Sequence, residues 1–386
     1  MELCDTKKCT GCFACMNACP RDAIHVSEDR YGKTIPQIDA VKCVNCGLCR
    51  KACPELNVPA LHEPLSCLAA WTNVPEDREK STSGGVATAL SRVIMKENGA
   101  VFGCAYGKNL VPEIRQADSE DDLRLFRGSK YVQSFTGFSY REVRECLKNG
   151  QKVLYIGTPC QISGLKQFIG KNDENLFTVD IICHGGTPVK YLQDYVWNKV
   201  GKNADRVTFR DTDDYGKNSF RVFSGEKQLF DSLSYKDYYY ESFLKGLTYR
   251  DNCYSCKYAS AKRVSDLTVG DFWGINRNTL RQKTDNRISV VLVNTAHGHD
   301  LMKMAEEILH MEERDISEAV DGNKQLRSPS VAPEDRQVFL DNLDRGFEAA
   351  VLCTEVGRNV SNNIKVSSPV YRVIQKLRRV LNGKEK

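Results

Sequence analysis

The sequence predicts a mixed α/β protein of the α+β class, with a small cysteine-rich domain, a larger body and a helical C-terminal tail. Residues 1–62 hold two copies of one cysteine pattern, and residues 63–345 alternate short apolar runs with helical patterns. Helical patterning dominates from about Ala305 onward, and residues 346–386 form a basic tail. The 386 residues fit about two to three domains, and a segment with two prolines places the first boundary after residue 62.

The N-terminal domain contains eight cysteines in an internal repeat, in which each member of the second set lies 34 residues after its counterpart. The sets are Cys9, Cys12, Cys15 and Cys19, followed by Pro20, and Cys43, Cys46, Cys49 and Cys53, followed by Pro54. The spacing C-x2-C-x2-C-x3-C-P is that of bacterial two-cluster ferredoxins, in which the fourth cysteine of each run ligates the other cluster. We therefore assign Cys9, Cys12, Cys15 and Cys53 to one [4Fe-4S] cluster, and Cys43, Cys46, Cys49 and Cys19 to the second.

The segment between the two runs supports this interpretation, because residues 24–26 and 35–38 are expected to form a hairpin around the turn at 30–33. A disulfide framework would require a secreted chain, and the first residues begin no apolar signal region. A zinc site of this kind uses two Cys-x-x-Cys pairs and does not need a third cysteine at the same spacing. The spacing favours two clusters over either alternative.

The body is predicted to contain a largely buried sheet. Its strand-like apolar runs are residues 100–105, 153–157, 177–182 and 288–293. The helical segment 161–168 lies between the second and third runs and predicts a βαβ crossover. Residues 206–210 and 220–223 alternate apolar and polar side chains and predict antiparallel strands.

Four further cysteines lie beside loop signals and are candidates for a third four-thiolate site. Cys160 and Cys183 each follow the end of a predicted strand, and Cys253 and Cys256 form a Cys-x-x-Cys pair. A buried, inert thiol is the alternative for each of them. The remaining cysteines are isolated in the sequence and are expected to be structural; they are Cys4, Cys67, Cys104, Cys146 and Cys353.

A hydroxyl- and glycine-rich loop that contains Ser83, Gly84 and Gly85 opens an apolar-periodic helix. Exposed N–H groups at such a helix start can bind an anion, although an ordinary N-cap is the alternative. Cubane clusters pass single electrons, so a chain of this length requires a centre that converts them to two-electron transfer, and flavin is the usual choice. Lys130 is a candidate cation beside the flavin ring, and Arg263 and Asp266 in the predicted loop 262–274 mark a second candidate region; a solvated surface turn is the alternative for each.

The net charge of +5 and pI near 8.3 are mild, and most of the excess lies at the C-terminus. This distribution excludes a nucleic-acid footprint, and no apolar run is long enough to span a bilayer. We expect a cytoplasmic protein. Residues 370–381 have helical apolar spacing with basic residues between, which fits a terminal helix packed on its own domain better than contact with a membrane surface or a partner.

Seven motifs together resemble the family of the beta subunit of the coenzyme F-420 (deazaflavin)-reducing hydrogenase. After the cysteine repeat come Ser83-Gly84-Gly85, Lys130-Tyr131, Gly157-Thr158-Pro159-Cys160-Gln161, Cys183-His184-Gly185, Cys253-x-x-Cys256 and Thr268-Val269-Gly270-Asp271-Phe272-Trp273-Gly274. The resemblance covers roughly residues 1 to 345. It implies an FAD-binding fold with a cubane cluster near the flavin, whose ligands here would be Cys160, Cys183, Cys253 and Cys256. It also implies flavin contacts from Ser83, Gly84, Gly85, Lys130, Tyr131, Thr158, Arg263 and Asp271.

The resemblance implies an oxidoreductase that passes single electrons between [4Fe-4S] clusters and FAD, with hydride exchange between FAD and a deazaflavin or another organic acceptor. Lys130 would be the catalytic cation. The expected partners are a ferredoxin or another redox protein and a small hydride donor or acceptor. A non-catalytic relay subunit, a flavin-free iron–sulfur protein and an oxidoreductase of bacterial polysaccharide synthesis are the alternatives.

Overall fold

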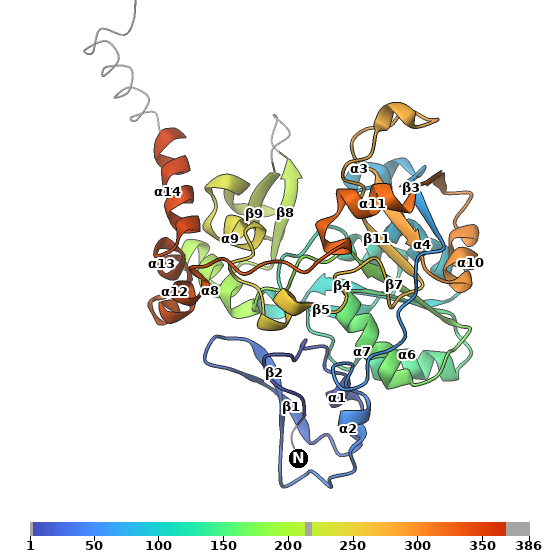
Figure 1. Ribbon diagram of the computed structural model, residues 1–386, viewed down its shortest axis with the longest axis horizontal. Helices are drawn as coiled ribbons and strands as arrows, with labels where there is room; N and C mark the ends of the chain where they lie inside the picture. The colour runs from blue at the N-terminus through green and yellow to red at the C-terminus, as the bar shows by residue number, and fades with distance from the viewer. Residues whose placement is uncertain (1–2, 213–217, 368–386) are drawn as a thin grey trace, which may run out of the picture.

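The computed structural model describes residues 3–212 and 218–367 of the chain. It contains a cysteine-rich N-terminal unit, a central eight-stranded sheet with helices on both faces, and a three-stranded sheet packed on a helical cluster (Figure 1). The predicted mixed α/β class is confirmed, with a ferredoxin-like N-terminal domain and a helical C-terminal stretch.

The N-terminal unit preserves the sequence repeat in its backbone. Its elements in order are α1 (Ala14–Asn17), β1 (Ile24–Glu28), β2 (Thr34–Ile38) and α2 (Leu48–Lys51). The hairpin is antiparallel, as expected. Gly11 and Asn45, which lie 34 positions apart, both have positive φ, and so do Phe13 and Gly47, which precede the two short helices. Equivalent turns therefore present both cysteine runs.

The central sheet has the strand order β13-β3-β12-β11-β7-β6-β4-β5. The strands are β3 (Ser66–Thr72), β4 (Ala100–Tyr106), β5 (Pro112–Gln116), β6 (Val153–Gly157), β7 (Leu176–Ile181), β11 (Leu267–Asp271), β12 (Ser289–Val293) and β13 (Leu309–Arg314). The middle pairs β11–β7, β7–β6 and β6–β4 are parallel, and the outer pairs are antiparallel. The predicted crossover is α7 (Pro159–Ile169), which joins β6 to β7.

Helices cover both faces of this sheet. One face carries α4 (Val86–Lys96) and α10 (Ala296–Met304), whose buried residues pack on the apolar strand side chains. The other carries α6 (Ser139–Lys148), α7 and, farther along, α11 (Ile316–Gly322). The short helices α3 (Pro75–Lys80) and α5 (Leu123–Phe126) lie in connections. Cys12, Ala14 and Ala52 join the core on the α6 and α7 face, so the N-terminal unit packs directly on this layer.

The second sheet is an antiparallel meander of β8 (Arg206–Thr212), β9 (Asn218–Ser224) and β10 (Lys227–Leu233). It shares one core with α8 (Val189–Val200), α9 (Tyr238–Leu244), α12 (Arg336–Asp341), α13 (Phe347–Leu352) and α14 (Glu355–Ser367). Tyr195, Phe209, Phe220 and Tyr239 contact one another at ring-centroid distances of 5.4 to 6.1 Å.

Strand β13 is the one strand in the described part of the chain after Ala305, where helix otherwise dominates as predicted. Its backbone pairs with β3 at the edge of the sheet, and this pairing overrides the local helical pattern. The predicted helix at 370–381 lies outside the described residues. Within the ranges described, none of the helices has the length and apolar character that a bilayer crossing requires.

Candidate functional site

The eight repeat cysteines line two small cavities in the N-terminal unit. One cavity is lined by Cys9, Cys12, Cys15 and Cys53, and the other by Cys19, Cys43, Cys46 and Cys49. These are the crosswise sets that two cubane clusters require. We call the first set site I and the second set site II. Cys4, which is isolated in the sequence, also lines site I because the chain before Cys9 folds back over it.

Site I lies against the helix that begins beside Cys160. A Cβ atom added at Gly164 of α7 would lie 2.9 Å from Cys12 Sγ, so only glycine permits this approach. Cys160 is one helical turn before Gly164. The Tyr140 hydroxyl donates to the carbonyl oxygen of Gln161, the residue after Cys160, at 2.8 Å, and it would lie 3.1 Å from the same added Cβ atom at Gly164. Site I and Cys160 therefore share the α6 and α7 layer.

Replacing Gly164 by alanine should destabilise this contact, because the added methyl group overpacks against Cys12. We expect a loss of about 1–3 kcal/mol in unfolding free energy, measured by urea denaturation at matched iron content. At Gly186 an added Cβ atom would meet nothing closer than 3.6 Å, so Gly186→Ala is the matched control. Equal stability of the two variants would contradict the close approach at Gly164.

The four candidate ligands of the third site come together at the carboxyl ends of the central strands. Cys160, Cys183, Cys253 and Cys256 all line one large cavity. Burial, together with the charges of the neighbouring cysteines, raises the pKa of Cys183 to about 12 and that of Cys253 to about 11. Four thiolates at one buried place therefore need a compensating positive charge, which a metal cluster supplies.

Local backbone geometry presents these thiols. Thr158 begins α7 in a capping box with Gln161, so Cys160 lies in the first turn, and Thr158 Oγ1 is 3.2 Å from Cys160 Sγ. Gly186 N donates to Cys253 Sγ at 3.4 Å, which ties the loop after β7 to the Cys-x-x-Cys segment. Within residues 3–212 and 218–367 no group of three or more His, Cys, Asp or Glu is spaced to hold a single metal ion.

The large cavity has a volume of about 560 Å³, which is within the usual range for cofactor sites. The first turn of α4 forms one wall. The N-cap residue Gly85 has φ 81° and supplies no side-chain cap, and Ser83 Oγ instead bonds to Ser289 Oγ at 3.0 Å. Because the ordinary N-cap is absent here, the first N–H groups of α4 are available to a ligand in the cavity.

Of the three residues in the predicted glycine loop, two line the cavity and one packs against the sheet. Ser83 and Gly85 line the cavity. A Cβ atom added at Gly84 would lie 2.2 Å from the carbonyl oxygen of Ala70, so Gly84 is needed for close packing of the loop on β3. Its N–H donates to Ser289 Oγ at 2.9 Å.

Lys130 and Tyr131 both line the cavity. Lys130 Nζ donates to the carbonyl oxygens at the end of α5, at 3.1 to 3.4 Å, and burial lowers its pKa. The three N–H groups of the Lys130 ammonium can each donate to one of these carbonyl oxygens. Lys130 must therefore give up one of these hydrogen bonds in order to donate to a flavin. The Tyr131 ring stacks on Phe243 at a centroid distance of 4.3 Å.

Part of the predicted 262–274 loop is a strand, because Leu267–Asp271 form β11 between β7 and β12. The prediction of a loop is wrong for these residues, and the side chains of Arg263 and Asp271 lie in different environments. Asp271 lines the cavity and pairs with Arg210. Arg263 is 1% exposed, is not one of the lining residues and forms an ion pair with Asp180 at 2.7 Å. It also donates to the Tyr258 carbonyl at 2.6 Å. The structure therefore places Arg263 in the core behind the cavity, where its N–H groups donate to other protein groups.

Arg127 and Gln325 line the cavity but were not singled out from the sequence. Among the described residues, Arg127 Nε and Gln325 Oε1 are buried and have no hydrogen-bond partner. Arg127 also pairs with the fully buried Asp77. An unpaired buried donor indicates a missing ligand, and a cation near the start of α4 suits an anionic one. In the sequence, only its position directly before Gly128 could have drawn attention to Arg127.

A buried arginine connects site I to the Cys253 loop. Arg250, 2% exposed, donates to the carbonyl oxygens of Cys9 and Thr34, both at 3.0 Å, and to Gln133 Oε1 at 2.8 Å. Its Nε donates to Asn252 Oδ1 at 3.4 Å, one residue before Cys253. One guanidinium therefore fixes the first cluster loop against the third thiol site.

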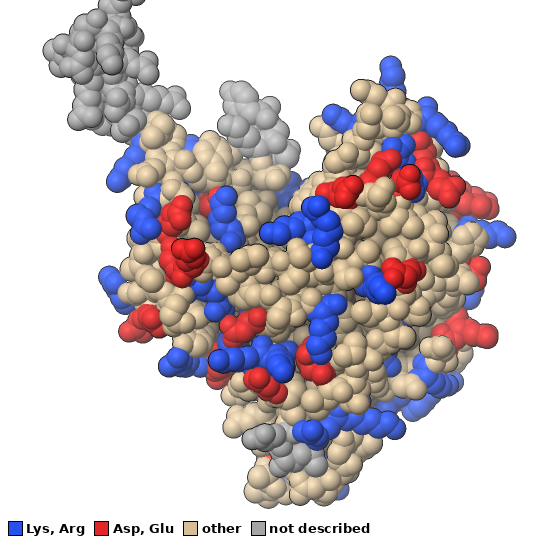
Figure 2. All heavy atoms as spheres, in the orientation of Figure 1, with Lys and Arg blue, Asp and Glu red and all other residues tan. Residues whose placement is uncertain are grey.

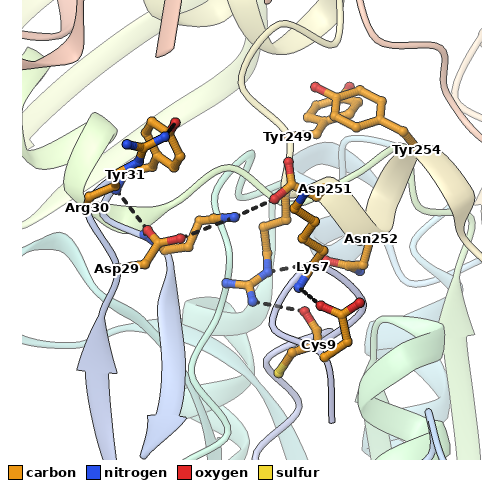
Figure 3. A network of polar contacts seen from close by, with 12 residues as sticks. Lys7, Cys9, Asp29, Arg30, Tyr31, Tyr249, Asp251, Asn252 and Tyr254 are labelled. Carbon is orange, nitrogen blue, oxygen red and sulfur yellow. Dashed lines mark hydrogen bonds and ion pairs between the residues drawn. The ribbon is translucent and has the colours of Figure 1, made fainter. Parts of the chain in front are cut away.

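Charged side chains extend this connection to the N-terminal hairpin (Figure 3). Lys33 pairs with Asp29 at 3.2 Å and with Asp251, and Arg336 pairs with Asp251 at 2.8 Å. The carboxylate of Asp251 therefore joins the turn of the N-terminal hairpin to α12 through the segment that carries Cys253.

Two family models match the chain. Residues 8–56 match a 4Fe-4S dicluster domain, and residues 150–319 match the C terminus of the beta subunit of coenzyme F420 hydrogenase/dehydrogenase. No curated protein matches. A chain in the xenon-derivatised F420-reducing [NiFe] hydrogenase complex from Methanosarcina barkeri is 18% identical, with a TM-score of 0.46 over 69% of this chain and 91% of that one. A likeness of this size carries no argument about function.

The two matched segments contain the two thiol arrangements described above. Sites I and II lie within residues 8–56, and Cys160, Cys183, Cys253 and Cys256 lie within residues 150–319. The chain therefore joins a 4Fe-4S dicluster domain to a segment that matches the C terminus of the beta subunit of coenzyme F420 hydrogenase/dehydrogenase, and this combination supports an electron-transfer oxidoreductase.

Proposed function

We propose that the chain is an iron–sulfur flavoprotein that passes single electrons between three [4Fe-4S] clusters and FAD and exchanges hydride with a deazaflavin or another organic molecule. One observation carries this proposal. Four cysteines from three separate segments line the same cavity as the uncapped start of α4. A cluster and an anionic cofactor would thus be neighbours.

The packing supports an order of centres. Site II is the farther from the cavity, because site I packs on α7, and α7 carries Cys160 into the cavity wall. Arg250 links the site I loop to the segment before Cys253. We infer that electrons pass between site II, site I and the third site in that order.

The residues around the cavity fit FAD. The first turn of α4 and Arg127 would hold the pyrophosphate, because unpaired N–H groups and a cation lie on the same wall. Lys130 and Tyr131 would lie along the ring system, with Thr158 and Asp271 at the strand ends. FAD supplies the conversion between single electrons and hydride when it is bound.

The cavity mouth carries aromatic residues for the second reactant. His184 and Trp273 are in edge-to-face contact at a centroid distance of 5.5 Å, and Trp273 is 46% exposed. Phe243 and Tyr240 line the same cavity. These rings offer a flat apolar surface to a planar acceptor and exclude water from the interior.

Replacing Arg127 by methionine should weaken FAD binding by about 10- to 100-fold, because a charge-assisted hydrogen bond to phosphate is lost. Asp77 keeps Arg92 as a partner at 2.6 Å, so the fold should survive. The measurement is FAD affinity of the flavin-depleted protein by fluorescence quenching. Arg124→Met is the matched control, because Arg124 is an exposed residue of α5, the helix that ends just before Arg127. Unchanged affinity in Arg127→Met would remove Arg127 from the flavin site.

The proposed activity is tested by mixing the oxidised, anaerobically prepared protein with a panel of two-electron donors, and the reduced protein with acceptors. We expect at least one compound to bleach or restore the flavin absorbance at a rate that depends on its concentration. If the flavin responds only to one-electron reagents, the chain is an electron-relay subunit whose hydride chemistry lies elsewhere.

A further inference from the structure

Site II faces the solvent, whereas site I faces the body of the protein. Cys46 is exposed, and Cys43 is half-buried, whereas all four cysteines of site I are buried. The segment 41–51, which supplies three cysteines of site II, is exposed at most positions. A small protein could approach site II directly.

The surface around site II has an apolar centre. Val41 is 96% exposed, Val44 is 60% exposed and Leu48 is 44% exposed. All three lie within eight residues of one another in the chain. Apolar side chains at this level of exposure, grouped over a redox site, are typical of an interface centre with a polar rim.

Basic residues flank this centre, and one of them, Lys42, has its Nζ 3.9 Å from the Asp39 carboxylate. Arg21, which lines the site II cavity, and Lys42 and Lys51 are exposed. Segment 41–51 contains no Asp or Glu in its sequence. In Figure 2 the lower end of the molecule, which the N-terminal unit forms, shows Lys and Arg and very little Asp or Glu. We call Arg21, Val41, Lys42, Val44, Leu48 and Lys51 the site II face.

We propose that the site II face docks an acidic one-electron carrier protein of the ferredoxin type, and that electrons enter or leave the chain there. The positive rim attracts and orients an acidic partner, and the apolar centre closes the contact. In the inward direction one electron leaves the reduced carrier, which is oxidised, and site II is reduced by one; no bond or proton changes. The inference rests on the clusters of the proposed function.

The test uses the anaerobic holoprotein and an acidic two-[4Fe-4S] ferredoxin as the probe. Stopped-flow mixing gives the second-order rate of cluster reduction, and calorimetry gives the affinity. We expect Lys42→Glu/Lys51→Glu to slow the reaction by roughly tenfold or more at low salt, with the difference shrinking as salt screens the charges. The control Lys80→Glu/Lys96→Glu makes the same charge change on α3 and α4 and should behave as wild type.

A second variant, Val41→Glu, tests the apolar centre and should weaken binding even at high salt. Each variant must have the iron content of the wild-type protein and must be reduced by dithionite at the wild-type rate. If the wild-type protein itself contains no clusters that dithionite reduces, the proposed function is wrong, and this outcome is distinct from failure of the docking proposal. If both variants at the site II face bind and react with the ferredoxin as wild type does, or if the control loses as much, the docking proposal is wrong.

Discussion

Replacing Cys253 and Cys256 together by serine is expected to remove about four iron atoms per chain and to stop electron transfer between the N-terminal clusters and the flavin. Both thiols line the large cavity with Cys160 and Cys183, and two remaining thiols cannot hold a cubane. Sites I and II do not share these residues. Dithionite should therefore still bleach the N-terminal clusters.

The measurements are iron analysis and stopped-flow absorbance at the cluster and flavin bands. Cys353→Ser is the matched control, because Cys353 follows α13 and its thiol contacts only nearby groups, the Ala349 carbonyl at 3.4 Å and the Arg345 guanidinium at 3.7 Å. Unchanged iron content in the Cys253/Cys256 double variant would show that these cysteines bind no cluster.

Replacing Asp180 by asparagine should destabilise the fold more than replacing Gly164 by alanine. Asp180 is fully buried on β7 and pairs with the buried Arg263 at 2.7 Å. Loss of the carboxylate leaves an uncompensated buried cation, which costs roughly 3–5 kcal/mol. The measurement is the shift of the urea midpoint at matched cofactor content.

Glu145→Gln provides the comparison, because it breaks the exposed pair with Lys148 at 2.8 Å and should leave the urea midpoint unchanged. A similar midpoint for Asp180→Asn and wild type would mean that Arg263 is stabilised by its carbonyl contacts alone. Arg263 would then be better regarded as a replaceable core residue than as the anchor of the loop after Cys256.

Spacing along the chain predicted the features that depend on local geometry. The cysteine repeat gave the crosswise thiol sets, and the apolar runs gave strands β4, β6, β7 and β12 and the α7 crossover. Cys160 and Cys183 could be placed together because neighbouring parallel strands end at one sheet edge.

Features that depend on long-range packing were not predictable in the same way. The need for glycine at Gly164 follows from Cys12, which is 152 positions away. The place of Arg263 follows from Asp180, and that of Arg250 from Cys9 and Thr34. Such pairs have no common spacing in the sequence. A segment with several charged residues, such as 262–274, resembles a site whether its side chains face a cavity or the core, and the strand β11 within it was read as a loop.

The most direct test is the iron and flavin content of the anaerobically purified protein. Three cubane clusters and one FAD in a single chain predict about twelve iron atoms and one flavin per polypeptide. Fewer than about eight iron atoms, or no flavin absorbance in protein purified and reconstituted without oxygen, would contradict the proposed path from the N-terminal clusters to FAD.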